Sequence, residues 1–396
     1  MKDAVIVSGV RTPIGTFGGV FSDYPATSLG SLTIKEAISR AGISADVVDE
    51  VMMGNVVSAG LGLNPARTST IHAGLPVTVP AMTVNKACGS GLKTIVLASQ
   101  AVRLGDADIV VAGGMENMSM APYLLPKARN GYRLGNGEVL DSLFQDGLVC
   151  ALEHCHMGVT AENIASRWEI SREDADEFSY GSHMKAIRAQ GDGTFEPEII
   201  PVPVPQRRGD PIIVDKDEHP RPDTTIERLA RLKPAFVEEN GTVTPGNSSG
   251  INDGAAAVVV MSDAEAQTRG LKPLAVIRGY ASVGVDPAVM GIGPVDAVKK
   301  VLAKTGLKLE DMDLIELNEA FATQALAVGR ELGWDWSKVN VNGGAVALGH
   351  PVGCSGARIL VTLLYEMQRR KSHYGLATLC MGGGMGLAMV VENPAA

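Results

Sequence analysis

The sequence predicts an α/β protein of two similar halves, each a doubly wound sheet, with a long insertion between the two copies. Three observations support this prediction. Apolar runs without polar alternation, typical of strands buried on both faces, alternate with stretches of helical periodicity. One pattern occurs near both ends of the chain, and residues 119–250 between the copies differ in composition. At 396 residues the chain is long enough for two or three domains.

Composition and charge exclude several classes of protein. With 45% hydrophobic and only 4% aromatic residues, the sequence predicts a globular fold with a core of small aliphatic side chains. No stretch reaches the roughly 18 apolar residues of a membrane span. A net charge of −9 argues against nucleic acid as a partner, because phosphate binding needs a basic surface. We therefore expect a protein that binds neither membranes nor nucleic acids.

The first element expected is a strand at residues 4–7, because the apolar run there is broken by Ser8 and Gly9. This run is too short for a secretory signal, and the final residues, ENPAA, carry no peroxisomal signal. The five cysteines then indicate reduced thiols rather than disulfides. Together these features predict a cytoplasmic protein.

The repeat is visible in two pairs of segments. Residues 37–43 (AISRAGI) resemble residues 301–307 (VLAKTGL), and residues 49–53 (DEVMM) resemble residues 313–317 (DLIEL). The same number of residues separates the two copies in both pairs. This constant spacing predicts two pseudo-symmetric α/β halves.

Each copy continues with a glycine-rich turn, a helix and a strand that ends in paired glycines. We expect the helices at residues 91–104 and 356–367, and the strands at residues 108–114 and 376–384. Apolar strands that alternate with helices of this length indicate sheets covered on both faces.

Residues 119–250 contain more prolines, glycines and charges, and they predict a lid or a module for ligand binding and assembly. A polar helix is expected at residues 160–189. Lysine and arginine are concentrated in residues 207–233. This basic run is either an ordinary solvated surface or a binding site for a small ligand that carries phosphate.

Cys88 lies in the stretch NKACGSGL, directly before the first of the two expected helices. A thiol at a helix N-terminus is close to free backbone N–H groups and to the positive end of the helix dipole, which lower its pKa. Gly89 and Gly91 leave room for an acyl group. Cys88 is therefore a candidate nucleophile, although a free cysteine is more often a small buried apolar residue.

His350 occupies the corresponding place before the second helix, in NGGAVALGHPVGCSG. A histidine there can pair with a thiol and can donate to a developing oxyanion. The repeat supplies the partner, because His350 and Cys88 precede equivalent helices. We expect the two side chains to meet at the interface of the two halves.

Asn318 and Cys380 stand at the ends of two further strands. The amide of Asn318 can orient a water or a carbonyl oxygen, or it can simply cap a helix. The glycines at 382–384 leave the backbone N–H groups after Cys380 unobstructed. One thiol would then be the covalent nucleophile, and the other a proton carrier close to an N–H that holds the substrate oxygen.

Four motifs together resemble the thiolase family: CGSG around Cys88, NEAF from Asn318, GHPVG around His350 and CMGGGMG from Cys380. The resemblance extends from VSGVRTPIGTFGG near the start to LATLCMGGGMG near the end. It implies the thiolase fold, a five-layer α-β-α-β-α arrangement of two duplicated doubly wound halves with an inserted loop domain. The implied domains are residues 1–118 with 251–272 (N-terminal half), 119–250 (loop domain for CoA binding and tetramer contacts) and 273–396 (C-terminal half).

The resemblance also implies an acyltransferase that condenses two acetyl-CoA into acetoacetyl-CoA and CoA by a ping-pong Claisen condensation, and runs the reverse thiolysis. The Cys88 thiolate takes the acyl group with help from His350, and Cys380 removes a proton from the second acetyl-CoA. His350 and Asn318, the latter through a water, form one oxyanion site. The N–H groups of Cys88 and Gly382 form the other. No metal or other cofactor is implied, since the CoA thioesters are substrates.

Within the family, the chain is most similar to short-chain enzymes of the biosynthetic type, through the stretches HMG (156–158) and VMG (289–291). This similarity implies a homotetramer, with residues 122–142 as the tetramer loop. Pro245 and Arg228 depart from the family pattern. The implied contacts to CoA and substrate are Leu148, His156, Met157, Arg221, Ser249, Met290, Ala320 and Phe321.

Four alternatives stay open. A 3-ketoacyl-CoA thiolase of β-oxidation with a broader chain-length range would fit the same family. A ketoacyl synthase shares the fold, but it uses a Cys-His-His set, and Asn318 and Cys380 occupy the places of the two histidines. An inactive acyl-CoA-binding protein would not need the thiols. A zinc module would use the cluster Cys150, His154, Cys155 and His156, which lacks the paired C-x-x-C spacing.

Overall fold

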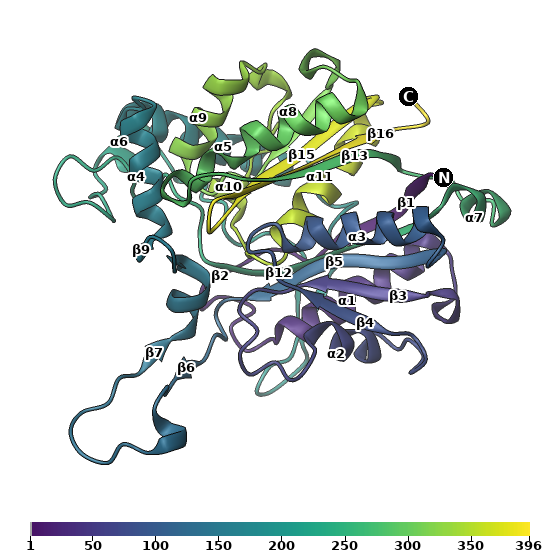
Figure 1. Ribbon diagram of the computed structural model, residues 1–396, viewed down its shortest axis with the longest axis horizontal. Coiled ribbons are helices and arrows are strands. Elements are labelled where there is room, and N and C mark those ends of the chain that lie inside the picture. The colour runs from purple at the N-terminus through teal and green to yellow at the C-terminus, as the bar shows by residue number, and fades with distance from the viewer. Residues whose placement is uncertain (1) are drawn as a thin grey trace.

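The computed structural model describes residues 2–396 and shows two α/β halves stacked on each other, with an arm that extends to one side (Figure 1). The sheet of the N-terminal half has the order β1-β12-β5-β3-β4, and that of the C-terminal half has the order β13-β16-β15-β14. The strands of the two sheets are β1 (Ala4–Arg11), β3 (Glu50–Gly54), β4 (Ala81–Val84), β5 (Ile109–Asn117), β12 (Asn252–Ser262), β13 (Ala275–Gly284), β14 (Leu314–Leu317), β15 (Tyr374–Met381) and β16 (Met385–Glu392).

The topology of the sheets confirms the repeat. In each half a long strand, β12 or β16, runs antiparallel to both of its neighbours. The strands beyond it are parallel to each other, β5 with β3 and β15 with β14. The two sheets meet where β1 pairs with β13, at Val5 with Val276 and Ile6 with Ala275.

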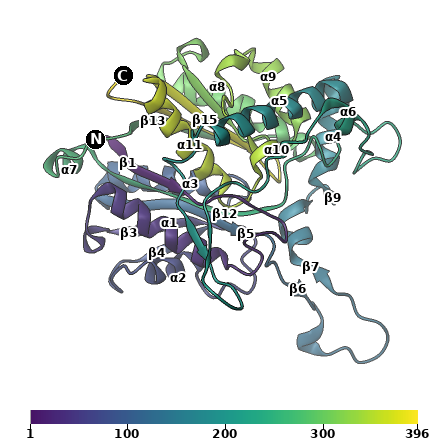
Figure 2. The same cartoon turned by 180° about the vertical axis from the view of Figure 1, so that it is seen from behind.

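Helices lie between the two sheets and on both outer faces, so the predicted five-layer arrangement is confirmed (Figures 1 and 2). α3 and α11 pack against each other between the sheets, α1 and α2 cover the N-terminal sheet, and α8 and α9 cover the C-terminal sheet. These helices are α1 (Ala26–Ala41), α2 (Pro65–His72), α3 (Ser90–Leu104), α8 (Gly293–Thr305), α9 (Ala322–Leu332) and α11 (Ser355–Arg370).

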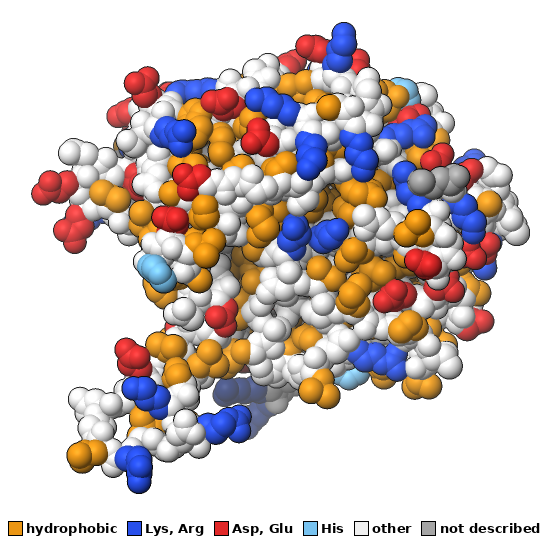
Figure 3. Space-filling view, in the orientation of Figure 1, with side chains coloured by type: hydrophobic (Ala, Val, Ile, Leu, Met, Phe, Trp, Pro, Cys, Tyr) orange, Lys and Arg blue, Asp and Glu red, His pale blue; other side chains and the backbone are white. Residues whose placement is uncertain are grey.

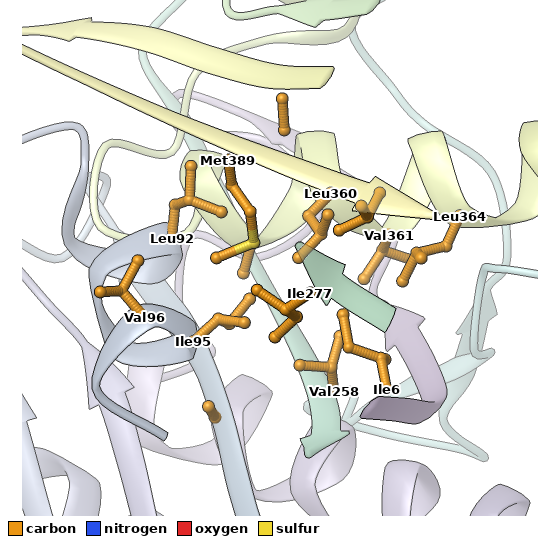
Figure 4. Close-up of a cluster of buried hydrophobic side chains, with 14 of the residues drawn as sticks. Ile6, Leu92, Ile95, Val96, Val258, Ile277, Leu360, Val361, Leu364 and Met389 are labelled. Atoms are coloured by element: carbon orange, nitrogen blue, oxygen red, sulfur yellow. The ribbon is translucent and has the colours of Figure 1, made fainter. Parts of the chain in front are cut away.

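The central layer forms a continuous apolar core (Figure 4). Side chains of α3 and α11 interlock there and meet strands of both sheets, which is why α11 is buried on nearly every side. Burial of each large aliphatic side chain stabilises the fold by about 1.5–3 kcal/mol. The side chains at the centre are Ile6, Leu92, Ile95, Val96, Val258, Ile277, Leu360, Val361, Leu364 and Met389.

Two glycines bring the N-terminal ends of α3 and α11 into direct contact. A Cβ atom at Gly91 would lie 2.8 Å from Ala357 N, and one at Gly356 would lie 2.5 Å from Leu92 N. No side chain fits at either position, so the two helix ends touch through their backbones. The turns that precede the helices, which carry Cys88 and His350, therefore lie side by side.

The segment between β5 and β12 forms the arm and a helical part that packs against α9. The β6–β7 pair leads into the arm (Figures 1 and 2). The elements of this segment are β6 (Tyr123–Leu124), β7 (Leu140–Asp141), β8 (Val149–Cys150), β9 (Cys155–His156), α4 (Met157–Arg167), α5 (Arg172–Gly191), β10 (Val202–Val204), β11 (Ile212–Val214) and α6 (Ile226–Ala230). Smaller elements are β2 (Gly15–Thr16), α7 (Asp263–Thr268), α10 (Ala345–Leu348), the 3₁₀ helices η1 (Ala45–Val47), η2 (Ala128–Asn130), η4 (Pro287–Ile292), η5 (Leu309–Asp311) and η6 (Trp336–Lys338), and the π-helix η3 (Phe144–Leu148).

Three expected elements differ from the structure. The first strand continues to Arg11, because Gly9 fits closely against Val258 and α11 instead of ending the strand. The helix expected at 160–189 is two helices, since Glu169 has a φ of 51° and Ser171 starts α5 with a capping box. The strand expected at 376–384 ends at Met381, and the glycines after it form a turn.

The surface is mixed in charge. Figure 3 shows acidic and basic side chains interspersed over both halves, with apolar groups between them. In residues 2–396, no helix combines the length and the apolar character that a membrane crossing requires.

Candidate active site

A cavity of about 650 Å³ opens where the helical insertion meets the two turns. Cys88 enters it from the N-terminal half, His350 and Gly382 enter it from the C-terminal half, and Met157 enters it from the insertion. Three regions distant in sequence therefore share one cavity. All the residues that the sequence predicted as CoA contacts line it: Leu148, His156, Met157, Arg221, Ser249, Met290, Ala320 and Phe321.

Cys88 stands in a tight turn between β4 and α3. Ala87 has a φ of 46°, in the left-handed region that residues with a side chain rarely adopt. Ser90 holds this conformation, because its Oγ donates to Ala87 O at 2.6 Å and accepts from Lys86 N at 2.8 Å. The turn leaves the Cys88 thiol partly exposed at the cavity.

The ionisation of Cys88 differs from the expectation. Burial raises the pKa of this thiol to about 11, and the Glu116 carboxylate acts in the same direction. The backbone N–H groups of Gly382 and of Cys88 itself oppose this shift, but burial between the two halves outweighs them. The turn thus holds a neutral thiol, and the backbone N–H groups of Cys88 and of Gly382, which comes from the opposite half, lie near it.

The hydrogen bonds of His350 define its tautomer. Its Nδ1 lies 2.6 Å from Ser355 Oγ, and that hydroxyl donates to Pro351 O at 2.9 Å. Because the only hydroxyl hydrogen is used, Nδ1 must carry the imidazole proton and Nε2 keeps a free lone pair. Burial, followed by the charge of Arg358, lowers the pKa of His350 to about 3, so the ring is neutral. The backbone N–H of His350 donates to Asn252 Oδ1 at 2.9 Å.

Asn318 lies against the same histidine. Its Nδ2 is 3.5 Å from each ring nitrogen of His350, and its backbone N–H donates to Thr378 O at 3.0 Å. The Oδ1 atom is buried and accepts no hydrogen bond from residues 2–396. Asn318 does not line the cavity, but its amide lies beside the His350 ring, which does.

Cys380 is fully buried at the end of β15 and does not line the cavity. It packs in one apolar cluster with Met157, Met290 and Phe321. Burial, and after it the charge of Cys88, raises the pKa of Cys380. The Cys88 thiol is therefore close enough to influence the titration of Cys380.

The basic run at 207–233 does not gather at the cavity as one unit. Only Arg221 among its basic residues lines the wall. Arg207 and Arg208 lie in the exposed turn between β10 and β11, a hairpin that packs on the outer core of the N-terminal half. Arg228 does not line the cavity and forms an ion pair with Asp223. Pro245, the other departure from the family pattern, lines the cavity.

Among residues 2–396, no three His, Cys, Asp or Glu side chains are placed to hold a metal ion. In the cluster that the sequence offered for zinc, His156 makes other contacts. His156 Nδ1 accepts from Gly158 N at 3.0 Å, so it caps α4, and its ring stacks on Phe236 with centroids 4.6 Å apart. The zinc alternative therefore lacks a ligand set in the described chain.

Three polar residues that position the site were not predicted from the sequence: Ser355, Asn252 and Glu116. The buried Glu116 carboxylate accepts from Val56 N at 2.9 Å and from Gly353 N at 2.9 Å, so it ties the N-terminal half to the turn that follows His350. Burial raises its pKa to about 7 despite these donors. A carboxylate at the end of an apolar strand was the available signal for Glu116. For Ser355 it was the serine within GHPVGCSG.

Comparison with known families matches residues 4–264 to the N-terminal domain of thiolase and residues 271–393 to its C-terminal domain. The Escherichia coli acetyl-CoA acetyltransferase is 57% identical over 99% of this chain and 100% of its own length. The enzymes of that name from Pseudomonas aeruginosa and Cupriavidus necator are each 56% identical over the same shares. The crystal structure of the Bacillus anthracis acetyl-CoA acetyltransferase has a TM-score of 0.97 and 46% identity, and the match covers 99% of both chains.

Proposed function

The chain belongs to the thiolase family, and on this premise we propose that it is an acetyl-CoA C-acetyltransferase. It condenses two acetyl-CoA into acetoacetyl-CoA and free CoA, and it catalyses the reverse thiolysis. One observation carries the assignment of the site: Cys88 from the N-terminal half lines the same cavity as His350 and Gly382 from the opposite half.

In the first half-reaction, Cys88 attacks the carbonyl carbon of acetyl-CoA. Nε2 of the neutral His350 takes the thiol proton, which then passes to the leaving CoA sulfur. The N–H groups of Cys88 and Gly382 hold the resulting negative oxygen, because both lie beside the Cys88 thiol at the cavity. The products are an acetyl thioester on Cys88 and free CoA.

In the second half-reaction, the Cys380 thiolate removes a proton from the methyl group of another acetyl-CoA. The carbanion attacks the thioester carbon on Cys88, the C–S bond to Cys88 breaks, and the released Cys88 thiolate takes up the proton that Cys380 removed. His350 and a water held by Asn318 stabilise the enolate oxygen of the second acetyl-CoA. The acetylated Cys88 carries no charge, so it does not oppose the Cys380 thiolate at this step.

Side chains around Cys380 support a short acyl chain. Met157, Met290 and Phe321 belong to the same apolar cluster as Cys380 and line the cavity, so their bulk limits the length of an acyl group beside the thiols. We propose a preference for acetyl and acetoacetyl groups over longer 3-ketoacyl groups. Thiolysis rates over a series of 3-ketoacyl-CoA substrates test this preference, and equal rates for four-carbon and eight-carbon substrates would contradict it.

We propose that CoA lies along the cavity wall, with its pantetheine between Leu148, Met157 and Phe321 and its nucleotide near Arg221. These four residues line the cavity that Cys88 enters. Arg221 is the basic residue of the 207–233 run that reaches the cavity, so it provides the positive charge for the CoA phosphates. A cytoplasmic homotetramer, with residues 122–142 as tetramer contacts, completes the proposal.

Separate assays of the two half-reactions test the roles of the cysteines. Cys88→Ala should abolish the transfer of labelled acetyl groups to the protein. Cys380→Ala should still accept the label but fail to form acetoacetyl-CoA. Cys155→Ser serves as a matched thiol control, because this residue does not line the cavity. A Cys88→Ala variant with wild-type activity would overturn the assignment.

A further inference from the structure

A hairpin in the cavity wall carries two cysteines directly opposite each other. β8 and β9 are antiparallel, and their register pairs Val149 with His156 and Cys150 with Cys155. Opposed residues in such a pair have Cα atoms about 4.5–5.5 Å apart. A disulfide requires a Cα separation of about 4.4–6.8 Å. The register therefore places the two thiols within bridging range without any change in strand pairing.

The two thiols differ in access. Cys155 is partly exposed, whereas Cys150 is 2% exposed. An external reagent therefore reaches Cys155 first, and Cys150 is positioned to resolve the product. Burial raises the pKa of Cys155, and the charges of Cys150 and Glu153 act in the same direction. The pair should thus react faster at alkaline pH than at neutral pH.

We propose that Cys150 and Cys155 form a redox-active dithiol site, which small organic disulfides such as glutathione disulfide oxidise to an intrachain disulfide. The Cys155 thiolate attacks one sulfur of the small disulfide, forms a mixed disulfide and releases one thiolate. The Cys150 thiolate then attacks the Cys155 sulfur and releases the second thiolate. The pair loses two electrons and two protons, and the small disulfide is reduced to two thiols.

The bond would act on the substrate cavity. Cys150 and Val149 belong to the cavity wall, as does His156, which directly follows Cys155. The His156 ring contacts two phenylalanines, Phe236 at 4.6 Å and Phe144 at 5.7 Å between ring centroids. The bond fixes the hairpin and with it the position of the His156 ring at the cavity wall, which weakens the binding of the CoA thioester. This effect on binding rests on the proposed function, whereas the disulfide itself does not.

Peptide mapping of the full-length protein tests the disulfide. The protein is incubated with glutathione disulfide at pH 8.5, free thiols are blocked with N-ethylmaleimide, and the chain is cut with trypsin. Residues 134–167 form one tryptic peptide that contains only these two cysteines. We expect this peptide unblocked and about 2 Da lighter, because two hydrogens are lost. Cysteines that carry N-ethylmaleimide, or that retain glutathione, would overturn the proposal.

Kinetics with a matched variant test the effect on the cavity. We expect oxidised wild-type protein to have a several-fold higher KM for acetoacetyl-CoA than Cys155→Ser treated in the same way. Dithiothreitol should abolish this difference. Both proteins contain Cys88 and Cys380, so any oxidation of these residues affects both alike. Equal KM values would overturn the effect on substrate binding. Failure of the proposed function would instead leave both proteins inactive before oxidation, with the peptide result unchanged.

Discussion

Ser355 Oγ lies 2.6 Å from His350 Nδ1 and donates its hydrogen to the carbonyl oxygen of Pro351. This arrangement leaves Nδ1 as the protonated nitrogen and directs the basic Nε2 away from Ser355. Ser355 opens α11, whose N-terminal end touches that of α3. The contact between the two central helices and the state of the imidazole therefore depend on the same turn of backbone.

Replacing Ser355 by alanine should lower kcat for thiolysis by about 10–100-fold, because the imidazole loses the partner that fixes its tautomer and orientation. KM should change little, since Ser355 does not line the cavity. Ser355→Thr keeps the hydroxyl and should recover most of the activity. Ser99→Ala is the control for stability, because Ser99 is also a fully buried serine but lies in α3. Unchanged kcat in Ser355→Ala would show that the tautomer is set by another group.

The alkylation rate of Cys88 should rise with pH without a plateau below pH 9.5. Burial raises the pKa of this thiol to about 11, so the reactive thiolate fraction grows about tenfold for each pH unit. The rate of modification by iodoacetamide, followed by mass spectrometry on the peptide that contains Cys88, measures this dependence. Cys88→Ala is the blank. A plateau below pH 8 would instead reveal a preformed pair of thiolate and imidazolium.

Glu316→Gln should become more stable relative to the wild type as the pH rises. Burial raises the pKa of Glu316 from 4.5 to about 8, even though Arg358 Nη1 lies 3.6 Å from its Oε2. The folded protein thus binds this proton more tightly than the unfolded chain. The resulting stabilisation is complete below pH 4.5 and is lost as the pH rises through 8.

Between pH 4.5 and pH 8, the difference in the free energy of unfolding between Glu316→Gln and the wild type should grow by up to about 1.4 kcal/mol per pH unit. Urea unfolding at pH 5.5, 7 and 8.5 measures it. Glu310→Gln, at an exposed position in η5, should show no such trend. A difference independent of pH would mean that Glu316 stays ionised throughout.

Gly356→Ala should destabilise the fold by about 1–3 kcal/mol and reduce activity, because the added Cβ would lie 2.5 Å from Leu92 N and force α3 and α11 apart. Gly181→Ala is a matched control within α5, where an added Cβ meets no atom within 4 Å. That change should stabilise the protein by up to about 1 kcal/mol. Thermal unfolding and thiolysis rates measure both variants, and equal stability of the two would contradict the close helix contact.

Local patterns predicted the elements that depend on local physics. α3 and α11, the helices that follow Cys88 and His350, begin and end close to the expected residues. Their apolar spacing and their flanking glycines can be read directly from the sequence. The long helix expected in the insertion is interrupted at Glu169. The sequence did not predict this break, because an interruption in a polar helix changes its hydrophobic periodicity very little. Of the lysines and arginines in residues 207–233, only Arg221 lines the cavity. The β10–β11 hairpin carries Arg207 and Arg208 to another surface.

The sequence by itself determined the duplicated architecture and the family, and it predicted the two thiols and the imidazole of the candidate site, because each of these is encoded in spacing and residue type. Only the tertiary structure decided their chemical state. The high pKa of Cys88, the neutral His350 and the facing pair Cys150 and Cys155 all depend on how deeply each group is buried and on what lies opposite. Burial and strand register arise from contacts between residues far apart in the chain, so no local pattern contains them.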